Sequence, residues 1–242
     1  MNTHSFLSRF RHSLIPRRAA ILLVALALSG FAAAGETNDA VEAALSRLAA
    51  GGEIHDAAKA GDSSKLKALL KGNPNLVFSK DNDGHTPLHY AALNGHKSAV
   101  KLLLASNADI NARDKVGQTT LHYAARTGDK GIAKLLLANK AEVDARDIYD
   151  LTPLHEAAHD GHKNVAAMLV AKKAEVNAKD KFGRTPLHYA AHNGHEGVAK
   201  FLLAKKAEIN ATDDASWTPL HAAAAEGHKD VAALLRQHGG HE

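Results

Sequence analysis

Two short apolar patterns alternate along most of the chain, and each has the spacing of a helix. The first is seen in PLHYAAL, residues 87–93, and the second in AVKLLLA, residues 99–105. In the second pattern Leu102, Leu103 and their equivalents form one apolar face. One pair of helices cannot bury such a face alone, so neighbouring pairs must stack to form a core. The pattern therefore predicts an all-α protein.

The pair of patterns recurs with a period of 33 residues that does not slip. Five aligned segments are HTPLHYAALNGH (85–96), QTTLHYAARTGD (118–129), LTPLHEAAHDGH (151–162), RTPLHYAAHNGH (184–195) and WTPLHAAAAEGH (217–228). Their shared histidine falls at His89, His122, His155, His188 and His221. A fixed period of this length indicates a repeat architecture.

The boundaries of each helix can be assigned from residue chemistry. A Thr followed by Pro starts the first helix, because Pro loses no hydrogen bond at the first helical position. A glycine ends it, at Gly95, Gly128, Gly161, Gly194 and Gly227. An Asp opens each repeat as a turn former, at Asp81, Asp114, Asp147, Asp180 and Asp213. Asp150 and Ser216 stand where other copies have Gly, so we expect those two turns to be strained or reshaped.

These residues closely resemble the ankyrin repeat, a β-turn followed by T-P-L-H-x-A-A-x-x-G-H and a second helix. The resemblance covers about residues 53–240 and implies a solenoid of helix-turn-helix units joined by β-turn or hairpin loops. The implied repeats are 53–80, 81–113, 114–146, 147–179, 180–212 and 213–240. Residues 35–52 are interpreted as an N-terminal capping segment. The resemblance also implies that the shared histidines bridge adjacent loops, and that His96, His162, His195 and His228 bond loop backbone.

The third copy contains HEAAH, residues 155–159, which matches the zinc-binding run of many metalloproteases. Its Glu recurs in no other copy, Gly161 ends the helix, and no third ligand follows. A zinc hydrolase is therefore the weakest alternative. A second alternative is a metal-binding periplasmic protein that uses His159 and His192, which share one position in neighbouring copies. We expect no catalytic residue, cofactor or resident metal.

Residues 1–34 have the layout of a secretory signal peptide. Basic residues precede an apolar stretch from Ala19 to Leu28, and small residues lead to an expected cleavage after Ala34. The stretch has half the length of a membrane span, which needs about 20 apolar residues. An uncleaved anchor and a twin-arginine route through Arg17 and Arg18 stay open. The expected location is the periplasm or the exterior.

The overall charge predicts no nucleic-acid partner, and we expect no membrane partner once the signal peptide is cleaved. The chain has a formal charge of +4, but residues 35–242 hold 26 basic and 26 acidic side chains, interspersed along the sequence. Nucleic-acid binding requires a basic patch or stripe. The absence of cysteine excludes disulfides and Cys-based zinc sites.

The positions that vary between copies are the candidates for recognition. They lie at the loop tips and at the exposed end of the first helix. Exposed apolar side chains in adjacent copies indicate a binding surface, and Trp, Tyr and Arg commonly anchor interfaces. The candidate partner-binding residues are Val116, Arg126, Tyr149, Leu151, His159, Phe182, Arg184, His192 and Trp217, with Ile148 beside them. The sequence thus favours a monomeric, non-catalytic scaffold that binds another protein through the concave face.

Overall fold

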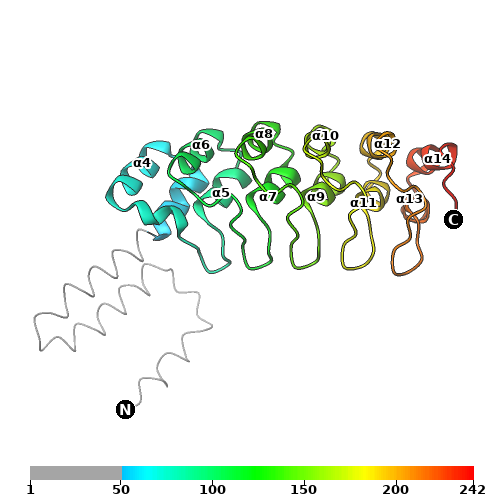
Figure 1. The fold of residues 1–242 in the computed structure, drawn as a ribbon, viewed down its shortest axis with the longest axis horizontal. Coiled ribbons are helices and arrows are strands. Elements are labelled where there is room, and N and C mark those ends of the chain that lie inside the picture. The colour runs from blue at the N-terminus through cyan, green and yellow to red at the C-terminus, as the bar shows by residue number, and fades with distance from the viewer. Residues whose placement is uncertain (1–50) are drawn as a thin grey trace, which may run out of the picture. The chain divides into compact units, whose positions relative to one another are not determined.

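Short helices follow one another in pairs through residues 51–242, the part of the chain that the computed structural model describes (Figure 1). Residues 51–60 are helical and precede α4 (Ser63–Gly72) and the 3-10 helix η2 (Pro74–Phe78). Then come α5 (Pro87–Leu93), α6 (Lys97–Ala105), α7 (Thr120–Thr127), α8 (Lys130–Ala138), α9 (Pro153–His159), α10 (Lys163–Ala171), α11 (Pro186–His192), α12 (Glu196–Ala204), α13 (Pro219–Ala225) and α14 (Lys229–Gln237). No strand occurs among these residues, and the all-α solenoid is confirmed. The signal peptide and most of the capping segment lie outside the described residues.

The helices form two rows, with the connecting loops along one edge (Figure 1). The second helices, α4, α6, α8, α10, α12 and α14, make one row, and the first helices lie between them and the loops. Residues 51–242 cluster as a compact unit separate from residues 1–50. None of the described helices is long and apolar enough to cross a membrane.

Leucine and alanine fill the space between the rows. The leucine after the Thr-Pro start is fully buried in each copy, as Leu88 and Leu154 are, and Leu103 and Leu136 of the second helices are equally buried. Burying one leucine contributes roughly 1.5–3 kcal/mol. Alanines such as Ala91 are also fully buried and let adjacent first helices approach closely. Stacking therefore supplies the core that one pair lacks.

Each first helix starts with a cap shared by Thr and His. In α5 the backbone N–H of Thr86 donates to Nδ1 of His89 at 2.9 Å, and the Thr86 hydroxyl oxygen accepts from the His89 N–H. The same reciprocal box occurs in α7, α9, α11 and α13. A Pro occupies the first turn in each of these helices except α7. The predicted Thr-Pro start is confirmed.

The second ring nitrogen of the same histidine reaches the loop that leads into the next first helix. Nε2 of His89 donates to the carbonyl of Ala112 at 3.0 Å. The equivalent bonds join His122 to Leu151, His155 to Arg184, and His188 to Trp217, at 3.0 to 3.2 Å. Three histidines that follow a helix-ending glycine bond backward, His96 to Lys59, His162 to Arg126 and His195 to His159, through backbone carbonyls. The bridging role implied by the family resemblance is present in the structure.

The loops that open each repeat share one turn conformation, even in the two copies where Asp or Ser replaces Gly. Oδ1 of Asp81 accepts backbone N–H groups from residues two and four positions later, both at 2.9 Å. The third residue after the Asp is left-handed, with φ of 82° at Gly84. Asp150 and Ser216 adopt the same conformation, with φ of 59° and 63°. These two turns are therefore strained but keep their shape.

Replacing Ser216 by Gly should stabilise the protein, because glycine adopts this backbone conformation without steric cost. We expect the free energy of unfolding to rise by about 0.5–1 kcal/mol in urea titrations. The reverse change, Gly117→Ser, should destabilise by at least about 1 kcal/mol. A Cβ at Gly117 would lie 3.1 Å from Cα of Asp147. Unchanged urea midpoints in both variants would contradict backbone strain at this position of the turn.

Mild acid should weaken the fold through the buried histidines. Burial lowers the pKa of His89 and of His155 from the usual 6.5 to about 4. The unfolded chain therefore binds more protons than the folded chain between about pH 6.5 and pH 4, and stability is lost as the pH falls through this window. By the acid end of this window, each of the two histidines has lowered the free energy of unfolding by on the order of 3 kcal/mol.

Urea midpoints measured from about pH 7 down to about pH 4.5 test this dependence. His155→Gln should flatten the dependence of the urea midpoint on pH. Stability that is constant over this range would rule out the buried neutral histidines.

Candidate binding surface

Large apolar side chains are exposed at the tips of four consecutive loops. Val116, Ile148, Tyr149, Phe182 and Trp217 are between 41% and 52% exposed. Each stands in the loop that precedes a first helix, and Val116, Tyr149 and Phe182 are 33 residues apart, whereas Trp217 lies two residues beyond the equivalent position. Of the large apolar side chains exposed in residues 51–242, only Phe78 and Leu93 lie elsewhere. A row of this kind on a soluble surface is characteristic of a contact surface. We call Val116, Tyr149, Phe182 and Trp217 the tip residues.

Two candidate arginines are held by aromatic rings, Arg184 beside the tip residue Phe182 and Arg126 in the last turn of α7. The guanidinium of Arg184 lies 4.9 Å from the Phe182 ring centre and 4.8 Å from that of Tyr189. It also forms an ion pair with Asp180 at 2.9 Å. Both arginines are half-buried, and Arg126 lies 4.6 Å from the centre of the Tyr123 ring. These contacts fix side chains that otherwise lose rotamer freedom when a partner binds.

The other end of the first helix places two candidate histidines at the surface. His159 is exposed and its Nδ1 lies 2.9 Å from the carboxylate of Asp160. His192 is exposed and lies 3.7 Å from the carboxylate of Glu226, in the following copy. Trp217, at a tip, stacks on the ring of His221 with centroids 6.3 Å apart. The candidates therefore surround the first helices rather than gathering into one pocket.

The prediction that Leu151 faces solvent is wrong, because its side chain is half-buried. His85 and Gln118 occupy the same position in the two preceding copies. Nε2 of His85 lies 2.9 Å from the Tyr123 hydroxyl, and Nε2 of Gln118 donates to Glu156 at 2.9 Å. Both contacts reach the first helix of the next copy. In these two copies the position makes contacts within the stack, whereas Trp217, at the same position of the fifth copy, is 46% exposed.

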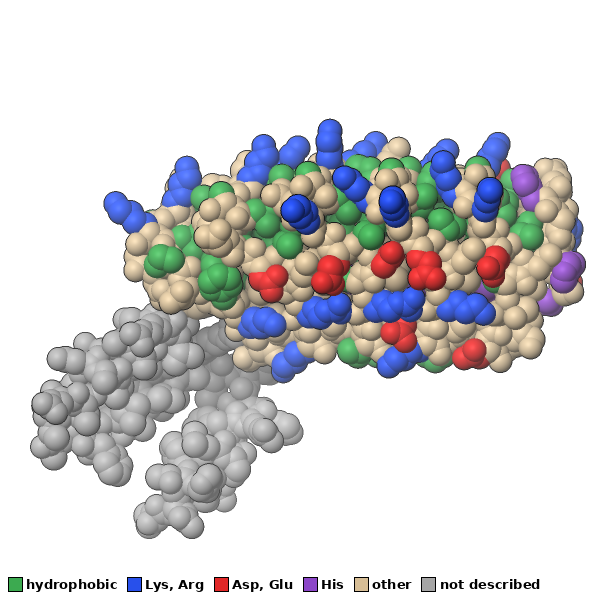
Figure 2. Space-filling model, viewed as in Figure 1, with side chains coloured by type: hydrophobic (Ala, Val, Ile, Leu, Met, Phe, Trp, Pro, Cys, Tyr) green, Lys and Arg blue, Asp and Glu red, His purple; other side chains and the backbone are tan. Residues whose placement is uncertain are grey.

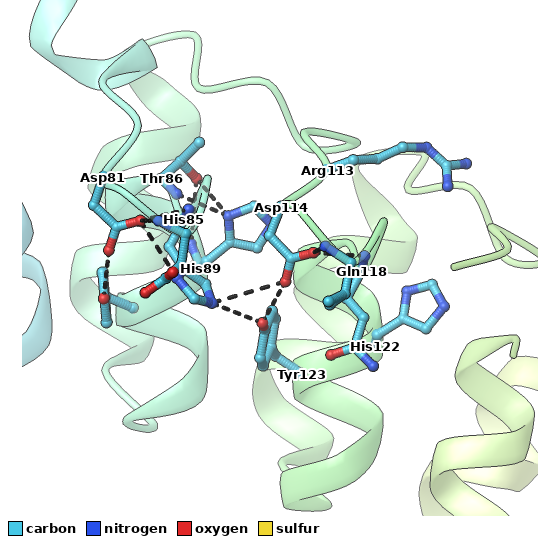
Figure 3. A network of polar contacts seen from close by, with 12 residues as sticks. Asp81, His85, Thr86, His89, Arg113, Asp114, Gln118, His122 and Tyr123 are labelled. Carbon is cyan, nitrogen blue, oxygen red and sulfur yellow. Dashed lines mark hydrogen bonds and ion pairs between the residues drawn. The ribbon is translucent and has the colours of Figure 1, made fainter. Parts of the chain in front are cut away.

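A buried polar network runs beneath the tips and differs between copies (Figure 3). The hydroxyl of Tyr123 donates to Asp114, and Tyr189 donates to Asp180 in the same way. Figure 3 shows His85 directed toward both Tyr123 and Asp114. Because the Tyr123 hydroxyl hydrogen is used for Asp114, His85 must donate from Nε2.

In the copy that contains HEAAH, Glu156 replaces that tyrosine. Gln118 then contacts both Glu156 and Asp147, the latter at 3.4 Å. Glu156 is only 9% exposed, and burial raises its pKa. The sequence signal for this network was Glu156 at a position where three other copies have Tyr.

The geometry of HEAAH is that of a structural element. Nδ1 of His155 accepts from the N–H of Thr152 at 3.0 Å, and Nε2 donates to the Arg184 carbonyl at 3.2 Å. Both ring nitrogens of His155 are therefore used, and neither can bind zinc without breaking the cap. His159 points to solvent, away from that buried ring.

One group of residues in the described part has the spacing of metal ligands, Asp81, Asp83 and His85, with ligand atoms within 4.8 Å of one another. Oδ1 of Asp81 already accepts two backbone N–H groups, and its Oδ2 accepts from Tyr90. The turn itself accounts for this group of acidic and imidazole side chains.

Comparison with known proteins agrees with this architecture. The family profile described as ankyrin repeats (3 copies) matches residues 54–147, 107–180 and 154–242. The chain therefore belongs to the ankyrin-repeat family. It is similar to the serine/threonine-protein kinase VIK of Arabidopsis thaliana, with 44% identity over 22% of this chain and 12% of that protein.

Other relatives match over equally short segments. The probable E3 ubiquitin-protein ligase XBOS32 of Oryza sativa subsp. japonica is 46% identical over 22% of this chain and 11% of its own length. Ankyrin repeat domain-containing protein 13C-B of Xenopus laevis is 42% identical over 22% of this chain and 10% of its own length. The chain spans about a tenth of these relatives, and the matched segments lie in the ankyrin-repeat region.

Chelation should leave the protein unchanged if HEAAH is structural. We expect EDTA to leave the thermal midpoint unaltered, and metal analysis of protein purified without an affinity tag to show far less than one zinc per chain. A catalytic site would hold about one zinc tightly. One zinc per chain that is lost in His159→Ala, together with hydrolytic activity, would contradict this interpretation.

Proposed function

We propose that this ankyrin-repeat chain is an exported scaffold that binds another protein and catalyses no reaction. The row of tip residues, flanked by Arg126, Arg184, His159 and His192, is the observation that carries the proposal. Repeat solenoids bind through extended surfaces of this kind. Because loops and helix ends are fixed by the stack, a partner docks with little loss of conformational entropy.

Export to the periplasm or the exterior rests on residues 1–34, whose sequence matches a signal peptide. The polar end of the solenoid supports a monomeric state. Helix α14 ends with Arg236 and Gln237, both exposed, where α12 has Leu203 and Ala204. A polar terminal repeat blocks further stacking and keeps a solenoid soluble.

Capture from periplasmic extract tests the binding surface. The bait is residues 35–242, compared with a triple variant carrying Tyr149→Ser, Phe182→Ser and Trp217→Ser. All three side chains are about half exposed, so the variant should retain its fold. We expect mass spectrometry to find a protein that the parent retains and the triple variant loses, with at least about a tenfold difference.

Phe78→Ser is the matched control, because Phe78 is 53% exposed but lies in η2, away from the tips. It should retain the same partner as the parent. Circular dichroism establishes that all baits are folded equally. Identical eluates from parent and triple variant would show that the tip residues do not form the binding surface.

A further inference from the structure

The fold separates charges that are interspersed in the sequence. The six second helices, each with the two residues that follow it, carry 16 basic and two acidic side chains. All other residues between 51 and 242 carry nine basic and 21 acidic side chains. The balanced total of the chain thus hides two surfaces of opposite sign. We call the exposed side of α4, α6, α8, α10, α12 and α14 the second-helix face.

The basic side chains of this face are exposed and almost all are unpaired. Lys97 and Lys101 lie one helical turn apart on α6, as Lys130 and Lys134 do on α8, so they share one side of the helix. Within residues 51–242 only two of the sixteen, Lys65 and Arg236, have a carboxylate within 4 Å. Figure 2 shows Lys and Arg side chains projecting from the row of second helices.

The chemistry of the face indicates which anion it binds. Fifteen of the sixteen basic residues are Lys, a compact point charge, and one is Arg, which forms the bidentate contacts used for specific phosphate recognition. None of the large apolar side chains exposed in the described residues lies on these helices. The face therefore lacks the aromatic rings on which unpaired nucleic-acid bases stack. The second-helix face is therefore suited to bind a broad anionic surface through electrostatic attraction, without specific recognition of individual groups.

We propose that the second-helix face docks on the anionic headgroups of a phospholipid bilayer, without inserting side chains, and leaves the tip residues directed away from the membrane. This revises the expectation of no membrane partner after cleavage of the signal peptide. The choice of lipid as the polyanion rests on the proposed export, since an exported chain meets membrane surfaces. The proposal concerns helices opposite the tip residues and is independent of the protein partner.

The acidic residues set the orientation. Loop and first-helix residues hold the excess of carboxylates, so a negative membrane repels that side while it attracts the second-helix face. The attraction acts only near the surface, because charges are screened over about 8 Å at physiological ionic strength. Binding is therefore reversible and weakened by salt.

Vesicle co-sedimentation with matched lysine variants tests this proposal. Residues 35–242, which include the whole compact unit, are mixed with vesicles of equal parts phosphatidylglycerol and phosphatidylcholine, or of phosphatidylcholine alone. One variant carries Lys134→Gln, Lys172→Gln and Lys200→Gln on the second-helix face. The control carries Lys59→Gln, Lys115→Gln and Lys181→Gln, which are equally exposed but lie outside it. Both variants lose the same net charge, and circular dichroism verifies their fold.

The parent should bind the anionic vesicles and release them at about 1 M salt, where screening acts over about 3 Å. The first variant should lose about 100-fold in partition coefficient, and the control less than about threefold. The triple tip variant should bind vesicles as the parent does, which separates this result from a failed protein capture. No preference for anionic vesicles, equal losses in the two lysine variants, or tighter binding to duplex DNA than to vesicles would overturn the proposal.

Discussion

The imidazole of the T-P-L-H segment joins two levels of structure, and the stack depends on it. Its Nδ1 accepts the N–H of the Thr that starts the helix, and its Nε2 donates to a carbonyl in the next loop. The ring can do both only when it is neutral and carries its hydrogen on Nε2. Because the accepting carbonyl lies 23 or 29 residues later, in the loop that leads into the next first helix, each helix start is tied to that loop.

This coupling explains why the framework could be predicted from the sequence. Thr86, His89 and Asp81 bond to backbone groups a few residues away, so these contacts can be predicted from the local sequence. The left-handed glycines are predictable for the same reason. Asp150 and Ser216 show how strongly neighbours impose the turn. Each adopts φ near 60° although glycine alone adopts it without cost. A family profile that covers these residues follows from the same local rules.

Side chains whose role depends on a neighbouring copy were not predictable in this way. Leu151 varies between copies as a recognition residue would, yet it is half-buried, because the adjacent first helix covers its position. Gln118 and Glu156 are 38 residues apart and substitute together for a tyrosine contact. One sequence without an alignment cannot reveal that such a pair is in contact. The exposure of the tip residues could be predicted from the sequence, because they lie at the ends of the loops. These residues are Val116, Tyr149, Phe182 and Trp217.

The lysines of the second helices are not required by the repeat. At the position of Lys101, other copies have Lys134, Lys200, Ala167 and Ala233, and the alanines support helices of the same length. Helix packing is therefore indifferent to this charge. Like charges on adjacent helices repel one another and destabilise the folded state, most strongly at low salt. This repulsion recurs from α4 to α14 although the repeat framework does not require the lysines. It is explained if the lysines bind an external anionic surface.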